Sequence, residues 1–233
     1  MIRKMALLSL SALAPVACGD GSSDGSAYYA GAQSAALGAA GNEADCALCH
    51  DNGDDRRGRP GNSMKDIAFR VDFKGGGGTT LLDAVNACVT GWMGGAALTA
   101  TDESYVALRT YLESISDPAV TAMNPLEPEV LADEAAYEAA YAGGDAAAGA
   151  TKYNQVCANC HAGGTTVGTE SASEKSEIAQ ETIGRLAQQV RTSGPPPSGT
   201  ADPSDSTPGP MPFFEPSDLS VQDLKDIIAH LKN

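Results

Sequence analysis

Cys46-Ala-Leu-Cys49-His50 and Cys157-Ala-Asn-Cys160-His161 are the two stretches of this chain that decide its fold. Both are Cys-x-x-Cys-His runs, and because the chain holds only six Cys and three His among 233 residues, two such runs do not arise by chance. Residues three apart on a helical turn share a face, so the two thiols of a run can bond to one edge of a porphyrin. The His that ends each run can then bind the iron. The runs predict two covalently bound c-type haems, attached through Cys46, Cys49, Cys157 and Cys160, with His50 and His161 as iron ligands.

Three other interpretations of the Cys pairs are weaker. A zinc site would gather four ligands at short spacings, whereas the two pairs lie far apart in the sequence. A thioredoxin-like redox pair would lie in a βαβ unit, and the chain has no strand-like runs. Structural disulfides suit an exported protein but require no His after each pair. Covalent haem would also supply the apolar mass that a chain with 5% aromatic residues otherwise lacks.

Composition limits the partners of the chain. It has 15 Lys and Arg against 30 Asp and Glu, a formal net charge of -15 and a pI of about 4.4. Nucleic-acid binding needs basic stripes and is not expected. The charge favours a soluble anionic protein, or partners that present a basic face.

The N-terminus predicts export. Arg3 and Lys4 precede a short apolar stretch within residues 1–17, which is typical of a signal peptide and too short to span a membrane. Cys18 follows, and it resembles the lipid-modified first residue of a bacterial lipoprotein, although Pro15 stands where Leu is usual. Ordinary cleavage near Ala17 is the alternative. We expect a periplasmic protein anchored to a membrane through Cys18, with residues 18–44, rich in Gly, Ala and Ser, as a flexible tether.

The order of parts indicates one small helical module used twice. Each half begins with a Cys-x-x-Cys-His run, continues through loops and ends with an amphipathic helix. We expect an all-α fold with a first module over residues 45–116, a linker over 117–143 and a second module over 144–233. Helices are predicted at about residues 102–116, 130–141, 145–158 and 175–192 and after Ser220, and the Pro-rich residues 193–214 predict an irregular loop.

Two stretches of the second module resemble the class I cytochrome c family. Residues 143–161, GGDAAAGATKYNQVCANCH, are similar to the opening helix of that family, and residues 209–233, GPMPFFEPSDLSVQDLKDIIAHLKN, to its distal loop and closing helix. The resemblance extends over nearly all of residues 45–233. It implies two tandem cytochrome c-like modules and Met211 as an iron ligand. The position of Met211 agrees, because a thioether in a Pro-rich loop before the last helix can reach the haem face opposite His161.

The first module resembles a narrower group. Residues 83–98, DAVNACVTGWMGGAAL, are similar to a stretch of dihaem thiosulfate dehydrogenases and of the catalytic cytochrome of the sulfur-oxidising system. The matching positions are Asn86, Cys88, Met93 and Gly94 or Gly95, whereas Gly91-Trp92 replaces the Arg-Ser that often precedes the Met. The resemblance implies Cys88 as the second ligand of the first haem. Met93, and water or another group, are the alternatives, and a buried thiol is the ordinary interpretation of Cys88.

The first functional hypothesis is an electron carrier. A thiolate ligand lowers the reduction potential of a haem and a His/Met pair raises it, so electrons would pass from the first module to the second and then to a protein partner. No acid/base or nucleophile constellation is visible in the sequence.

The second hypothesis is an enzyme that oxidises thiosulfate or another sulfur compound at the first haem. Residues 51–74 hold six basic and five acidic residues, the one stretch that could attract a small anion, although a solvated loop of mixed charge is the ordinary interpretation. Cys88 would bond the substrate sulfur, and Arg56, Arg57 or Arg59 would hold its anionic end. A dihaem peroxidase is a third and more distant hypothesis, because it needs an open iron beside an acid/base residue.

Overall fold

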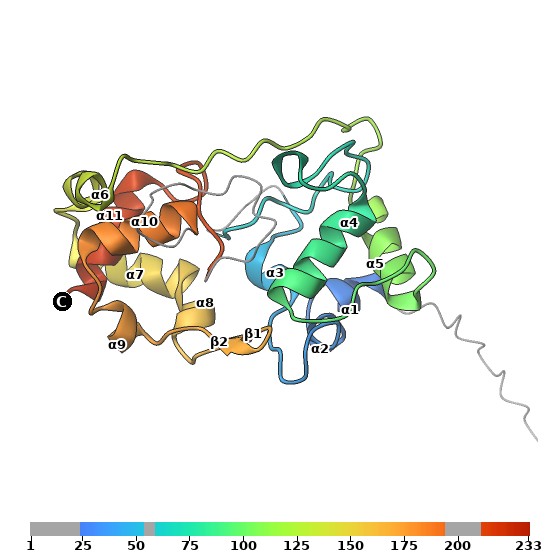
Figure 1. Ribbon diagram of the computed structural model, residues 1–233, viewed down its shortest axis with the longest axis horizontal. Helices are drawn as coiled ribbons and strands as arrows, with labels where there is room; N and C mark the ends of the chain where they lie inside the picture. Colours follow the sequence, from blue (N-terminus) through green and yellow to red (C-terminus); the bar gives the residue numbers. More distant parts are fainter. Residues whose placement is uncertain (1–23, 54–58, 194–210) are drawn as a thin grey trace, which may run out of the picture.

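The computed structural model describes residues 24–53, 59–193 and 211–233. The described chain is mainly helical, and α1 to α5 lie on one side of the molecule and α6 to α11 on the other (Figure 1). No helix among the described residues is long and apolar enough to cross a membrane. The elements are α1 Gly25–Tyr29, α2 Ala32–Ala35, α3 Cys46–Cys49, the 3-10 turn Lys74–Gly76, α4 Leu81–Asn86, the π-helical turn Ala87–Trp92, α5 Glu103–Ser114, α6 Glu134–Tyr141, α7 Ala146–Val156, α8 Ala158–His161, β1 Thr166–Val167, β2 Glu170–Ser171, α9 Lys175–Ile178, α10 Ile183–Thr192 and α11 Val221–Leu231.

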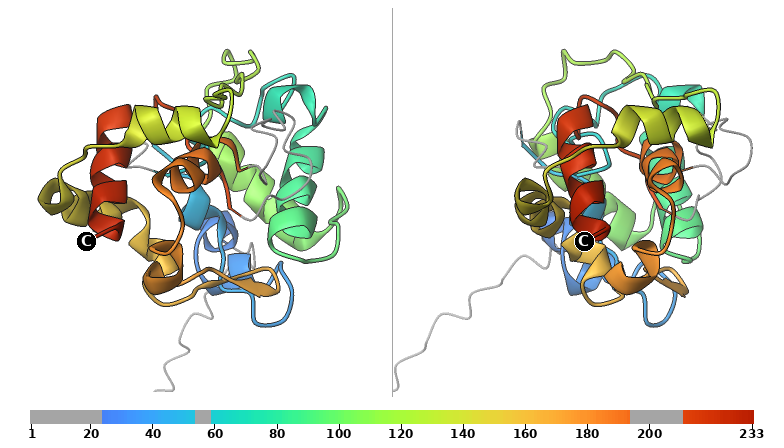
Figure 2. Two further views of the ribbon diagram at one scale, coloured as in Figure 1. Left: turned by 60° about the vertical axis from the view of Figure 1, so that its left-hand side comes forward. Right: turned by 90° about the vertical axis from the view of Figure 1, so that its left-hand side faces the viewer.

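A close crossing of α7 and α11 organises the second half. Asp145 caps α7, its carboxylate accepting from the backbone of Ala147 and Ala148, and Ser220 caps α11, the helix predicted to follow it. At the crossing, a Cβ on Gly149 would lie 1.8 Å from the Asp226 carbonyl oxygen, so only glycine permits this approach. Figure 2 shows α11, in red, lying against α7.

The same crossing recurs in the first half, between α1 and α5. A Cβ on Gly25 would lie 2.1 Å from the Ala107 carbonyl oxygen. One turn beyond each glycine, a Tyr ring meets an aromatic side chain of the closing helix. The ring centroids are 5.5 Å apart for Tyr29 and Tyr111 and 5.6 Å apart for Tyr153 and His230. The two halves therefore share one helix-packing arrangement.

The expected flexible tether is wrong over residues 24–44. These residues form α1 and α2 and pack into the first half, where Tyr29 is 5% exposed and Ser34 is fully buried. The many small residues that suggested flexibility instead allow α1 to approach α5 closely. Residues 18–23, with Cys18, and the predicted signal peptide over residues 1–17 lie outside the described residues.

The expected linker, residues 117–143, contains a helix that belongs to the core of the second half. Residues 117–131 cross the top of Figure 1 without regular structure, but α6 packs against α10 and contributes two buried side chains, Tyr137 and Tyr141, to the core of the second half. The helix predicted over 175–192 is also two helices, because Thr182 caps a new one by accepting from the Arg185 backbone. Most of the predicted Pro-rich loop lies outside the described residues.

Residues 42 and 43 join the two halves. Asn42 accepts from the Gly168 backbone (2.7 Å) and donates to the carbonyl oxygens of Ala35 (3.1 Å) and Ala44 (2.9 Å). Glu43 exchanges two hydrogen bonds with Thr166, both 2.8 Å long. Because Asn42 is buried and fully paired, this joint fixes the two halves in one orientation.

A single methyl group added where α7 crosses α11 should destabilise the protein. Gly149→Ala should lower the free energy of unfolding of the cofactor-loaded protein by about 1–3 kcal/mol or more, because the new Cβ would overlap the Asp226 carbonyl. Denaturant unfolding measures this, with Gly163→Ala as the control, since no atom lies within 4 Å of a Cβ there. Equal stability of the two variants would mean that the helices do not cross at Gly149.

Candidate functional site

The first Cys-x-x-Cys-His run lies on α3, a single helical turn; this run and the one in the second half are called attachment turns, after the haem attachment that the sequence predicts. The Asp45 carboxylate caps it by accepting from the Leu48 backbone at 2.7 Å, and the two cysteines three residues apart share a face. Burial raises the pKa of the Cys46 thiol to about 11. Burial also raises the pKa of the Cys49 thiol, with the neighbouring thiols of Cys160 and Cys88 adding to the rise. Both groups are therefore neutral thiols at physiological pH.

A backbone hydrogen bond fixes the ring of His50, the predicted iron ligand of the first half. Its Nδ1 lies 2.8 Å from the carbonyl oxygen of Asn62. A carbonyl can only accept, so Nδ1 carries the proton and Nε2 keeps its lone pair. Burial lowers the pKa of His50 against the opposing effect of this hydrogen bond, so the ring stays neutral. A neutral imidazole with an available Nε2 is the form that binds a metal.

The second attachment turn repeats these features. Cys157 ends α7 and Cys160 lies in α8, and burial raises the pKa of Cys157 to about 12. The Nδ1 of His161 lies 2.7 Å from the Ser173 carbonyl oxygen. Asn62 and Ser173 each follow their His by 12 residues, so the loops that orient the two imidazoles also correspond.

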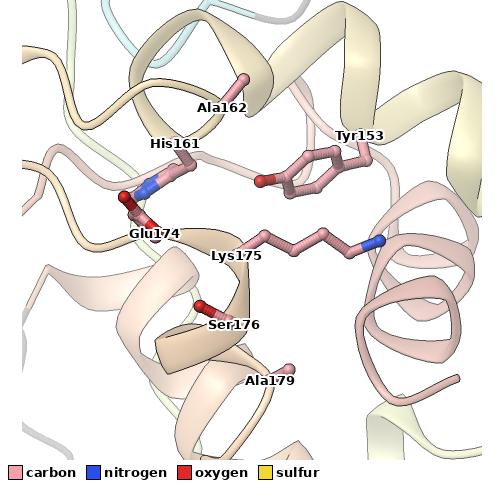
Figure 3. A pocket seen from close by; sticks show the side chains of 7 residues that line it. All are labelled: Tyr153, His161, Ala162, Glu174, Lys175, Ser176 and Ala179. Atoms are coloured by element: carbon pink, nitrogen blue, oxygen red, sulfur yellow. The ribbon is translucent and has the colours of Figure 1, made fainter.

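An open pocket of about 510 Å³ lies beside His161. Figure 3 shows the hydroxyl of Tyr153 pointing toward the imidazole and the side chain of Glu174 close to the ring. Neither Cys157 nor Cys160 lines this pocket, so it is not where the two thiols would bond a porphyrin edge.

Met211, the predicted distal ligand of the second site, lies at the start of the last described segment. Its side chain is half-buried against the core of the second half, and its carbonyl accepts from the Ser193 hydroxyl. The buried Arg191 holds the same loop by donating to the Phe214 carbonyl at 3.1 Å, and it pairs with Glu129 at 3.6 Å. The role of Met211 as a ligand stays a prediction.

Cys88 and Met93 lie on one segment, residues 86–98, whose two ends are held together by hydrogen bonds. Asn86 closes it with two hydrogen bonds to the Leu98 backbone, at 2.9 and 2.7 Å. Cys88 lies in the π-helical turn, and the electrostatic effect of its thiol adds to the raised pKa of both Cys46 and Cys49. Such π turns are frequent at functional sites.

Met93 is the alternative ligand on this segment, and it is 4% exposed. It precedes α5 by ten residues, as Met211 precedes α11 by ten. Both Cys88 and Met93 therefore remain candidates for the first site.

The basic loop is described only in part. Arg56 and Arg57 lie outside the described residues. The Arg59 guanidinium donates from Nη1 to the Leu48 carbonyl at 2.9 Å, so it is bound to the first attachment turn.

Three important residues were missed by sequence reasoning. Gly25 and Tyr29 repeat the spacing of Gly149 and Tyr153, and this repeat could have revealed the opening helix of the first half. The third, Asn42, joins the halves through a contact distant in sequence, for which no local signal exists.

One comparison with known proteins bears on the second half. Residues 144–231 match the family model of cytochrome c oxidase, cbb3-type, subunit III. The match supports a c-type cytochrome domain over these residues. Such a domain carries covalently bound c-type haem and transfers electrons to and from protein partners. No curated protein matches the chain.

The orientation of His50 depends on Gly61. A Cβ there would lie 2.3 Å from both Cε1 and Nδ1 of the imidazole. Gly61→Ala should therefore displace the ring and lower the low-spin fraction in the absorption spectrum of the purified protein. Gly53→Ala is the control, because no atom lies within 4 Å of a Cβ at that position. A wild-type spectrum in Gly61→Ala would mean that His50 is not a ligand in this orientation.

Proposed function

We propose that this chain is a dihaem c-type cytochrome of the bacterial cell envelope, which carries electrons between protein partners. One observation carries the proposal. After each Cys-x-x-Cys-His run, the imidazole Nδ1 is bonded to a backbone carbonyl 12 residues further on, at 2.8 Å for His50 and 2.7 Å for His161.

The residues present fit covalent haem at both sites. Each site offers two thiols spaced three residues apart and a His whose Nε2 is not engaged by its backbone hydrogen bond. Haem, when bound, supplies reversible one-electron exchange at its iron. The matched crossings at Gly25 and Gly149 support two modules of one design, the first over residues 24–116 rather than 45–116.

The predicted ligands and the positions of the two sites favour electron transfer from the first site to the second. Cys88 would lower the potential of the first site and Met211 would raise that of the second, so electrons would move toward the second. The Cys160 thiol contributes to the raised pKa of Cys49, which supports two attachment turns within electrostatic range of each other. The net charge of -15 favours a partner with a basic face.

A potentiometric titration tests the carrier function. The wild type should take up two electrons per chain in two one-electron steps. Met211→Ala should lower the higher midpoint potential alone, because the oxidised state is no longer disfavoured by a thioether. Met123→Ala is the matched control, since Met123 is 37% exposed. Unchanged potentials in Met211→Ala would exclude this residue as a ligand, and a wild type that takes up one electron would exclude a dihaem carrier.

Oxidation of a sulfur compound is the second candidate, favoured by the effect of the Cys88 thiol on the pKa of Cys46 and Cys49. Two thiosulfate ions would join through a new S–S bond and release two electrons. Gly91-Trp92 in place of Arg-Ser, and the bond of Arg59 to Leu48, favour the carrier instead.

A steady-state assay with thiosulfate and an artificial acceptor separates the two functions. Little turnover is expected from the wild type, and Cys88→Ala should alter the low-spin spectrum of one haem only. Rapid turnover that Cys88→Ala abolishes would establish the enzyme, and an unaltered spectrum would remove Cys88 from the iron.

We also propose export and lipid anchoring at Cys18, from the signal-like residues 1–17 and the Cys that follows them. Cys18→Ser should release the protein from the membrane fraction of broken cells. Recovery of the wild type in the supernatant would contradict the anchor.

A further inference from the structure

Arg191 is a fully buried cation in the last turn of α10. Its Nε donates to the Tyr141 hydroxyl at 2.7 Å and lies 3.6 Å from the Glu129 carboxylate. Its Nη1 donates to the Phe214 carbonyl at 3.1 Å. Removing one partner of a buried charge is strongly destabilising, so Arg191 holds these three groups together.

Two of these partners, Glu129 and Tyr141, belong to the stretch that the sequence predicted to be a linker. They lie within residues 127–141, which we call the α6 segment. The Tyr141 hydroxyl also donates to the Glu129 carboxylate, so the two partners bind each other. At the start of the segment, the Glu127 backbone donates to the carboxylate of the buried Glu215 at 2.8 Å. The α6 segment is therefore bonded to the second half near its last helix.

The third partner, Phe214, follows the predicted iron ligand Met211 by three residues. The Phe214 backbone donates to the Val190 carbonyl at 2.7 Å, and the Met211 carbonyl accepts from the Ser193 hydroxyl. Both side chains pack in the core of the second half. The end of α10 thus binds the stretch from Met211 to Phe214 at both of its ends, and Arg191 ties that stretch to the α6 segment.

We propose that Arg191 is a positioning residue for Met211, and that the α6 segment acts through it to keep the thioether on the iron of the second site. This rests on the proposed function, since it requires Met211 to be a ligand. A thioether is a neutral ligand that leaves the iron when the loop carrying it moves away. Each hydrogen bond that holds the loop makes this open form rarer, and a ligand that binds only the open form then binds more weakly.

Imidazole added to the oxidised, haem-loaded protein tests the proposal. It binds the iron where the thioether has left, and it removes the weak sulfur-to-iron absorption band of a Met-ligated haem. The part of that band that Met211→Ala abolishes belongs to the second site. In Tyr141→Phe, which keeps the ring but loses the bond to Arg191, the apparent affinity for imidazole at this site should rise roughly tenfold, the least factor expected for a hydrogen bond to a charged group. Arg191→Lys should raise it too, because Lys lacks the planar fork that binds Tyr141 and Phe214 together.

Glu138→Ala is the matched control. Glu138 also joins α6 to α10, but it accepts from the Gly184 backbone at 2.8 Å, in the first turn of α10 rather than the last. Denaturant unfolding is measured for every variant. Stability should fall in all three, whereas the imidazole affinity should rise only in Tyr141→Phe and Arg191→Lys.

The outcomes are distinguishable. The number of haems per chain, counted first from the pyridine haemochrome spectrum, tests the dihaem function by itself. A wild type without the sulfur-to-iron band, or with a band that survives Met211→Ala, overturns the ligand and the role of Arg191 with it. A band that depends on Met211, with an imidazole affinity unchanged in Tyr141→Phe or raised equally in Glu138→Ala, overturns the role of Arg191 alone. If Arg191→Lys does not retain both haems, Tyr141→Phe decides.

Discussion

The close contact of two helix backbones at a glycine is the constraint on which each half of this molecule depends. At Gly149 the backbone of α7 meets the Asp226 carbonyl, and at Gly25 that of α1 meets the Ala107 carbonyl. One turn further on, an aromatic pair locks the angle between the helices. In the second half, α7 runs directly into Cys157, so the crossing also sets the place of the attachment turn.

The first half uses the same crossing with a longer connection. Residues 30–45 separate Tyr29 from Cys46, whereas Tyr153 and Cys157 are one helical turn apart. The longer connection carries Asn42 and Glu43, whose hydrogen bonds to Gly168 and Thr166 fix the second half beside the first. This longer connection thus binds the segment before the first attachment turn to the segment that follows the second.

Local signals in the sequence predicted most helices and both attachment turns. The closing helices follow from the 3.6-residue apolar period, and the Cys-x-x-Cys-His runs from the covalent chemistry of the cofactor. Residues 24–44 could not be predicted in the same way, because small residues are as typical of a flexible tether as of a tight helix crossing. The break at Thr182 depends on one capping hydrogen bond, and the joint at Asn42 on residues more than a hundred positions away. Cys88 and Met93 share one segment, so sequence and backbone geometry leave both as candidates.

Mass spectrometry of proteolytic peptides tests the tandem arrangement most directly. With the protein matured in a host that exports it and attaches haem, one haem mass is expected on the peptide that contains Cys46 and Cys49, and another on the peptide that contains Cys157 and Cys160. Haem on the second peptide alone would contradict two redox modules and would reduce the first half to a structural partner of one cytochrome c domain.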